Sequence, residues 1–240
     1  ITKIALLAPF EGRYRDIGYN ALYAVRLAIK DSGLSNVHLL AVDDGGTVES
    51  AQDRMKALNI DPAVTAIIGL GQYSSHPDVQ NLAQKPFIIV GYWWHKNDND
   101  TILMAVNQDI GNQVTSNLDI TQLDSEEPIS GSDLLILKQV PDLYDDLANI
   151  EIVSSGQLPD TTFREQFINS DLYVPDPNLL ATLTYDIGNL ILDAIESDTS
   201  LVDMEYNGIN GTIRFSNGYW KDAPIHRYRY ENDQLVELTN

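Results

Sequence analysis

Two consecutive serines, Ser74 and Ser75, stand in the stretch "GLGQYSSHPD", which covers residues 69–78. The apolar stretch "VTAIIG" precedes them and residues 75–84 are typical of a helix, so the serines mark a strand-to-helix turn. The first N–H groups of a helix are free and carry partial positive charge, so serine hydroxyls there can bind a carboxylate or phosphate. The same hydroxyls also act as plain N-caps, and the local sequence leaves both roles open.

An aromatic cluster ends another apolar stretch, "KPFIIVGYWW", which is followed directly by a histidine. Tyr92, Trp93 and Trp94 are its members, with His95 next to them. Aromatic side chains at the end of a strand line a pocket, fill it or pack at an interface. The residues alone leave these roles open.

No metal site is indicated by the remaining polar residues. Asp43 and Asp44 lie in "DDGGT", but no further oxygen ligands follow at calcium-loop spacing, so a turn that caps the next helix is favoured. The four histidines are scattered, and no HExxH pattern occurs. Cysteine is absent, which excludes thiolate zinc sites and a cysteine nucleophile.

No catalytic constellation is visible either. The chain contains no G-x-S-x-G elbow, no P-loop and no complete G-x-G-x-x-G fingerprint. We therefore expect a binding protein rather than an enzyme, with no cofactor.

Composition narrows the class of partner. The chain has 240 residues and a formal net charge of −20, and such an acidic surface repels nucleic-acid phosphates and anionic lipids. No apolar run approaches the roughly 18 residues that a membrane helix needs. We expect a protein that binds no nucleic acid and is not inserted in a membrane.

Strands and helices alternate strictly over the first hundred residues, which predicts βαβ units and a parallel sheet with helices on both faces. Ligands on such sheets bind beyond the carboxyl ends of the strands, where the serines and the aromatic cluster lie. Strands are expected near 3–9, 37–43, 64–69 and 86–91, and helices at 19–33, 47–58 and 75–84.

The second half is less regular. The apolar segment "DLLILKQV" (133–140) predicts the central strand of a small second lobe. A long amphipathic helix is expected at 178–195, packed back on the first sheet. Alternating large residues around Asn217 and Gly218 predict an antiparallel ribbon at the end.

Five stretches, in the same order along the chain, resemble type I periplasmic solute-binding proteins of the branched-chain amino acid (Leu/Ile/Val) group. They cover about two thirds of the sequence. They are "KIALLAPFEGRYRDIGYNALYAVRLAIKDSG", "VHLLAVDDGGTVESAQDRMKALNIDPAVTAIIGLGQYSS", "KPFIIVGY", "ATLTYDIGNLILDAI" and "YNGINGTIRFSNGYWKDAPIHRYRYENDQLV".

The resemblance implies two α/β lobes that close on a ligand, joined by a hinge. Residues 1–100 and 155–210 would form a complete lobe one. Residues 101–154 and 211–240 would form a second lobe, shorter than is usual in the family.

The resemblance also implies ligand contacts. Ser74 and Ser75, beside Tyr73, match the segment that holds a ligand's carboxylate and ammonium. Tyr14 matches an aromatic loop position at the mouth of the cleft. Tyr92 and Trp93 match positions that are small in the family, so the pocket is expected to be remodelled for a flat or aromatic ligand, or plugged.

Two functions follow from the resemblance. The first is an extracytoplasmic (periplasmic or extracellular) binding protein for an amino-acid-like or other carboxylate or aromatic solute, working with the permease of an ABC-type transporter. The alternative is a ligand-sensing or interaction domain of a signalling protein, with a degenerate or plugged cleft.

Overall fold

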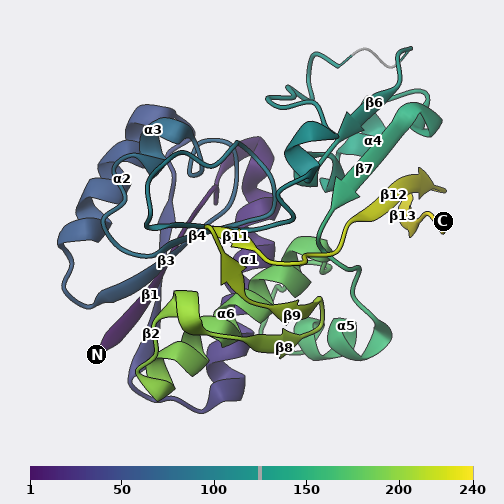
Figure 1. The fold of residues 1–240 in the computed structure, drawn as a ribbon. Coiled ribbons are helices and arrows are strands. Elements are labelled where there is room, and N and C mark those ends of the chain that lie inside the picture. Colours follow the sequence, from purple (N-terminus) through teal and green to yellow (C-terminus); the bar gives the residue numbers. More distant parts are fainter. Residues whose placement is uncertain (124–125, 240) are drawn as a thin grey trace.

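The computed structural model describes residues 1–123 and 126–239. The chain forms a large lobe, built on a seven-stranded sheet, and a small lobe, built on a four-stranded sheet (Figure 1). The expected second lobe, 101–154 and 211–240, includes residues 124, 125 and 240, which lie outside the described residues.

The large sheet has the strand order β10-β11-β5-β4-β3-β1-β2. Strands β1 to β5 pair in parallel, as the alternating pattern predicts, and the expected strands at 3–9, 37–43, 64–69 and 86–91 are confirmed. All four residues of β4 are buried because helices cover both of its faces. The strands are β1 (Thr2–Ala8), β2 (Val37–Asp43), β3 (Val64–Gly69), β4 (Phe87–Val90), β5 (Ile102–Ala105), β10 (Phe215–Ser216) and β11 (Tyr219–Trp220).

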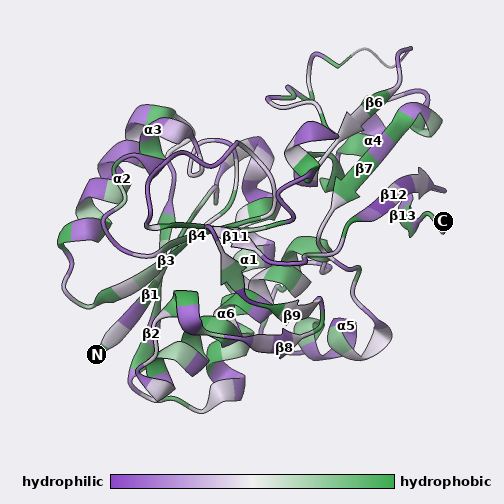
Figure 2. Cartoon of the chain, in the orientation of Figure 1, coloured by the Kyte–Doolittle hydropathy of each residue, from purple (hydrophilic) through white to green (hydrophobic). Residues whose placement is uncertain are grey.

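Helices α2 and α3 cover one face of this sheet, and α1 and α6 cover the other (Figure 1). Hydrophobic residues concentrate on the strands, and the outer turns of the helices are more polar (Figure 2). The helices of this lobe are α1 (Arg15–Ser32), α2 (Val48–Ile60), α3 (Pro77–Gln80), α5 (Thr161–Ile168) and α6 (Leu179–Ser197), with short 3-10 turns η1 (Gly12–Tyr14), η2 (Ile110–Asn112) and η5 (Leu201–Asp203).

Local signals set the ends of the long helices. The Thr47 hydroxyl accepts the Ser50 N–H at 3.1 Å and begins α2, and Gly33, at φ +70°, ends α1. Helix α6 packs on α1, where a Cβ on Gly188 would lie only 3.1 Å from the Cβ of Ala28. The expected return of residues 178–195 to the large lobe is confirmed.

Helix α3 is shorter than the expected helix at 75–84. The side chain of Asn99 donates to the carbonyl oxygens of Gln80 and Ala83, at 2.8 and 2.9 Å. These carbonyls would otherwise accept bonds from the next helical turn. The segment from 94 to 101 therefore satisfies the end of α3 in place of further helix.

The small sheet has the order β13-β12-β7-β6. Tyr228 pairs with Glu237 in an antiparallel ladder between the last two strands of this sheet. The expected antiparallel ribbon at the end of the chain is therefore confirmed. The elements of this lobe are β6 (Ile129–Gly131), β7 (Ile150–Ser154), β12 (His226–Glu231), β13 (Gln234–Glu237), η3 (Asp133–Ile136), α4 (Val140–Leu143) and η4 (Leu147–Asn149).

The central strand predicted at 133–140 is wrong, because this segment forms η3 and leads into α4. The Leu135 N–H bonds to the Ser132 carbonyl at 3.0 Å, which closes a local turn instead of a ladder. Leu134, Leu135 and Ile136 are buried all the same. A short apolar run looks identical in a buried strand and in a buried helical turn, and periodicity cannot separate them.

The lobe boundaries also differ from those expected. Strand β5 and the β10–β11 hairpin belong to the large sheet, so 101–105 and 215–220 are not part of the second lobe. Asn217 and Gly218 form the hairpin turn at φ +52° and +78°, which is the backbone that an Asn-Gly pair favours. A separate hairpin, β8 (Tyr206–Gly208) with β9 (Gly211–Ile213), lies beside α6 (Figure 1).

Within the described ranges, no helix combines the length and the apolar character that crossing a membrane requires.

Candidate functional site

The loops after β1, β2, β3 and β4 meet at the carboxyl end of the large sheet, where a parallel sheet places its ligands. These loops contain all six residues that the sequence nominates. The structure brings these residues together but divides them into a buried set and a partly exposed set.

Ser74 belongs to the buried set. Its side chain has no exposed surface, and its hydroxyl lies 2.6 Å from the Leu70 carbonyl and 3.3 Å from Oδ2 of Asp44. Burial raises the pKa of the Asp44 carboxyl, while the N–H of Gly46 acts in the opposite direction. Ser74 therefore connects the loop after β3 to the loop after β2 through a buried contact with Asp44.

Ser75 is equally buried, and its hydroxyl has no hydrogen-bond partner among the described residues. Its carbonyl accepts from Nε2 of Gln80 at 2.9 Å. The N-cap of α3 is His76, whose Nδ1 accepts the Asp78 N–H at 3.2 Å.

The capping role is wrong for both serines, because His76 is the N-cap of α3. Both serines are buried rather than facing an open gap between the lobes, and their contact with a ligand stays a prediction. Gly71, at φ +100°, does permit a close approach as expected. The neighbour is Pro9, whose Cδ would lie 3.1 Å from an added Cβ.

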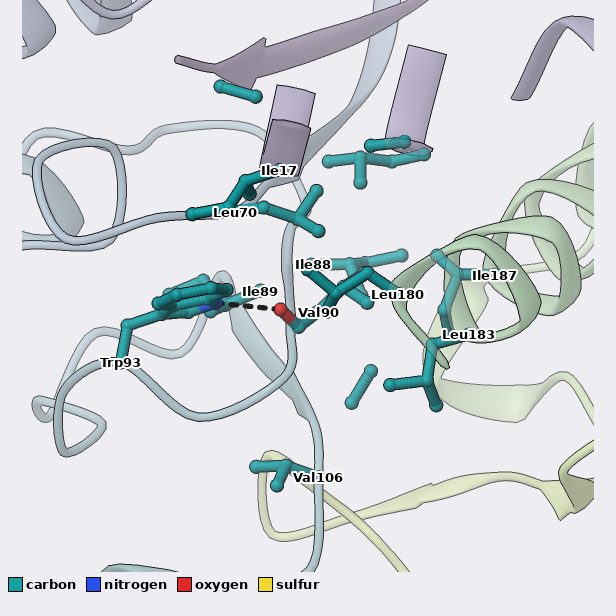
Figure 3. Packing of buried hydrophobic residues seen from close by; sticks show 14 of the residues in the cluster. Ile17, Leu70, Ile88, Ile89, Val90, Trp93, Val106, Leu180, Leu183 and Ile187 are labelled. Atoms are coloured by element: carbon teal, nitrogen blue, oxygen red, sulfur yellow. Dashed lines mark hydrogen bonds between the residues drawn. The ribbon is translucent and has the colours of Figure 1, made fainter. Parts of the chain in front are cut away.

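Tyr92 and Trp93 fill the space between the lobes. Trp93 is 4% exposed, donates from Nε1 to the Val90 carbonyl at 2.8 Å, and belongs to the large buried cluster with Leu70 (Figure 3). The Tyr92 hydroxyl lies 3.1 Å from Oγ of Ser116.

Beside these two rings remains a cavity of about 20 Å³, room for about one water molecule. The deep cleft is therefore occupied by the protein's own side chains.

A residue that the sequence did not nominate crosses this deep cleft. Asp133, at the start of η3, is fully buried, and its Oδ2 accepts the backbone N–H of Tyr92 at 2.7 Å. Its Oδ1 accepts the hydroxyl of Ser154, at the end of β7, at 2.6 Å. Burial raises the pKa of this carboxyl, and the hydrogen bonds oppose that rise. The apolar pattern of 133–140, which is typical of a strand, gives no signal for this role of Asp133.

Tyr14 and Tyr73 form the partly exposed set, and they line a cavity of about 320 Å³ at the mouth of the cleft. We call it the mouth cavity. Its other lining residues are Val48, Gln72, His76, Trp94, Asn117, Leu118 and Asp119.

The walls of the mouth cavity are fixed by specific contacts. Trp94 donates from Nε1 to the Gln72 carbonyl at 2.7 Å, and its ring packs edge-on against His76 with centroids 4.7 Å apart. Burial, and then the charge of Asp119, raise the pKa of Tyr14, which also places that carboxylate near the tyrosine. Trp94 belongs to the aromatic cluster that the sequence shows but is not among its predicted ligand contacts, and the sequence does not single out His76 or Asp119.

A second cavity, of about 380 Å³, lies beside the loop after β1 that contains Tyr14, and residues of both lobes line it. Arg13 and Arg15 come from the large lobe and Lys138 from the small lobe, and Nε2 of Gln139 bonds to the Arg13 carbonyl at 3.1 Å. Asp16 and Asp142 line it too, so cations exceed carboxylates there by one.

No protein-family model matches the chain, and no curated protein sequence matches it significantly. Solved structures, in contrast, match the chain over its full length. The leucine-binding protein LivK from Thermotoga maritima aligns over 100% of this chain and 98% of its own, with a TM-score of 0.77 and 13% identity.

Two further structures agree. The branched-chain amino acid substrate-binding protein LivJ from Streptococcus pneumoniae, in complex with isoleucine, has a TM-score of 0.68 and 13% identity, covering 99% of each chain. A solute-binding protein of an ABC transporter from R. palustris, in complex with benzoate, has a TM-score of 0.69 and 13% identity, covering 98% of this chain and 95% of that one.

The chain has the type I periplasmic-binding-protein fold. At 13% identity the likeness carries the fold and not the ligand. In this version of the type I fold the second lobe is reduced, with four sheet strands against seven. Its deep cleft is filled and its mouth holds a cavity of ligand size.

Proposed function

We propose that this chain is a small-molecule-binding protein, the substrate-binding component of an ABC-type transporter, and that its ligand binds in the mouth cavity. The observation that carries the proposal is this cavity of about 320 Å³ on the loops at the carboxyl ends of the strands. Its volume lies at the lower end of the range, roughly 300–1,000 Å³, that small-molecule sites occupy.

The lining defines a ligand class. Tyr14, Tyr73 and Trp94 supply aromatic walls, and Asp119 supplies an exposed carboxylate. Aromatic faces attract cations by about 0.5–2 kcal/mol, depending on exposure, and a carboxylate favours the same charge. A flat or amino-acid-like molecule with an ammonium group fits this lining.

The buried residues have a supporting role in this proposal. Ser74, Ser75, Tyr92 and Trp93 hold the loops that form the floor beneath the mouth cavity. A micromolar ligand needs about 8 kcal/mol. Most of that would come from apolar burial against Tyr14, Tyr73 and Trp94, because Asp119 is exposed and its charge is screened by water.

The proposed function places the protein outside the cytoplasm, with a membrane permease as its partner. A substrate-binding component acts outside the cytoplasm and delivers its solute to a permease. The net charge of −20 agrees with a partner other than nucleic acid.

A thermal-shift screen over amino acids, aromatic amines, amides and aromatic acids tests this function. A compound at 100 times its Kd stabilises the protein by about 2.7 kcal/mol, which raises the Tm by roughly 5–11 °C for this size of chain. Tyr73→Ala should abolish the shift. Tyr173→Ala, at a tyrosine that is 96% exposed and outside the cavity, should leave it unchanged. If both variants change the ligand-induced rise in Tm equally, the ligand does not bind in the mouth cavity.

The second candidate function, a sensor or interaction domain, is favoured by one specific observation. The side chains of Tyr92, Trp93 and Asp133 fill the deep cleft and leave a cavity of only about 20 Å³. If no compound in the screen stabilises the protein, the transporter function fails and this alternative is the one to pursue.

A further inference from the structure

The carboxylate of Asp133 lies in a pocket of donors contributed by both lobes. The large lobe supplies the N–H of Tyr92, which is 2.7 Å from Oδ2 and follows β4. The small lobe supplies the hydroxyl of Ser154, 2.6 Å from Oδ1, and that of Ser132, 3.0 Å from Oδ2. Hydrogen bonds from such donors to an ionised carboxylate are about twice as strong as bonds between neutral groups.

The donor pattern suits the two oxygens of a carboxyl group. The Ser154 Oγ accepts the Gly156 N–H at 3.0 Å, so its single hydrogen is free for Asp133. The Ser132 hydroxyl is shared, since the Val153 carbonyl lies 2.8 Å from it. Two donors from two lobes are therefore directed at the same carboxylate, one at each oxygen.

The backbone opposite is shaped to admit this carboxylate. Gly91 has φ +83°, and a Cβ added there would lie 2.7 Å from Oδ2 of Asp133. A side chain on residue 91 would thus enter the carboxylate's place. Among the described residues, no ion pair reaches Asp133, so hydrogen bonds alone offset its burial.

We propose that the Tyr92 N–H and the Ser154 and Ser132 hydroxyls form a carboxylate-binding site between the lobes, and that Asp133 occupies it as an internal ligand. The chain thereby closes its deep cleft with a side chain of its own. A carboxylate-bearing molecule enters this place only when the Asp133 carboxylate leaves it.

Removing the internal carboxylate tests this directly. Asp133→Ala leaves the donors unpaired around a space the size of formate or acetate. We expect the Tm to fall by roughly 5–10 °C, because unpaired buried groups are costly. Sodium formate should then recover several degrees with saturation, and sodium chloride at equal ionic strength should not. Wild type and Asp133→Asn, in which the site is filled, should show no formate-specific gain.

A second measurement covers a variant that fails to fold. In Asp133→Asn the acceptor of the Tyr92 N–H is a neutral amide, so hydrogen exchange in the peptide around residues 88–96 should accelerate at least several-fold. Asp142→Asn, at an exposed aspartate nearby, should leave this exchange unchanged. The proposal is overturned if Asp133→Ala keeps the wild-type Tm, if formate acts no better than chloride on a folded Asp133→Ala, or if exchange is unchanged in Asp133→Asn.

Discussion

Trp93 should behave as a packing residue of the core rather than as a wall of an open pocket. Its side chain is 4% exposed. Burying a tryptophan removes roughly 200 Å² from water, which at about 25 cal/mol per Å² corresponds to about 5 kcal/mol. Truncation to alanine retains a small part of that burial, and Trp→Ala changes in cores cost about 3–5 kcal/mol.

We therefore expect Trp93→Ala to lower the free energy of unfolding by about 4 kcal/mol, measured by urea denaturation. The bond from Nε1 to the Val90 carbonyl is part of this loss. For this size of chain the Tm should fall by roughly 8–16 °C. Indole should restore part of the stability by filling the new apolar cavity, and should leave wild type unaffected.

The neighbouring tryptophan is the matched control. Trp94 is only half-buried, and its main contacts are the Gln72 carbonyl and the His76 ring. Trp94→Ala should cost about 1–2 kcal/mol and show no rescue by indole. A loss below about 1 kcal/mol in Trp93→Ala, or equal losses in both variants, would refute the claim that the deep cleft is filled.

Three further changes test other contacts. Gly91→Ala should destabilise the chain by about 2–3 kcal/mol in urea denaturation, because its φ is +83° and the new Cβ meets Asp133. Asp186→Ala should cost about 3 kcal/mol by the same assay, since this buried carboxylate accepts the N–H and Nδ2 of Asn210, each at 2.8 Å. Burial raises the pKa of Tyr206 to about 12. The stability that the protonated Tyr206 side chain contributes is therefore full below about pH 10 and is lost as the pH rises from 10 to 12. Tyr206→Phe should lose less stability than wild type over that range.

Each of these has an outcome that contradicts it. A neutral Gly91→Ala would mean that Asp133 can leave its place without cost. Asp186→Asn keeps the size of the side chain and should lose less than Asp186→Ala, so equal losses would exclude the hydrogen bonds as the cause. Parallel pH profiles of Tyr206→Phe and wild type above pH 10 would show that Tyr206 titrates normally.

The first four strands could be predicted because each is an apolar run bounded by strong turn and helix signals. Thr47 begins α2 and Gly33 ends α1, each through contacts with close neighbours in the sequence. Such local causes are readable without a structure. The long helix α6 was equally plain, because apolar residues recur along it at helical spacing.

The errors have non-local causes. Helix α3 stops early because Asn99, 16 to 19 residues away, binds its carbonyl groups. The run at 133–140 folds as a 3-10 turn, with Asp133 bonded to Tyr92, which is 41 residues distant. The serines lie in the predicted loop, but the Ser74 hydroxyl lies 3.3 Å from the carboxylate of Asp44, which is 30 residues away in the sequence. No spacing rule could assemble Tyr14, Tyr73, Trp94 and Asp119 around one cavity.

The indole N–H signals of the three tryptophans test the central claim, ligand binding at the mouth above a filled cleft. Each gives one resonance in a ¹H–¹⁵N spectrum, assignable by Trp→Phe variants. Titration with the most stabilising compound of the screen should shift the signal of Trp94. Trp93 and Trp220, bonded to the carbonyls of Val90 and Thr212, should stay in place. A shift of Trp93 with Trp94 unchanged would place the ligand in the deep cleft and contradict the account.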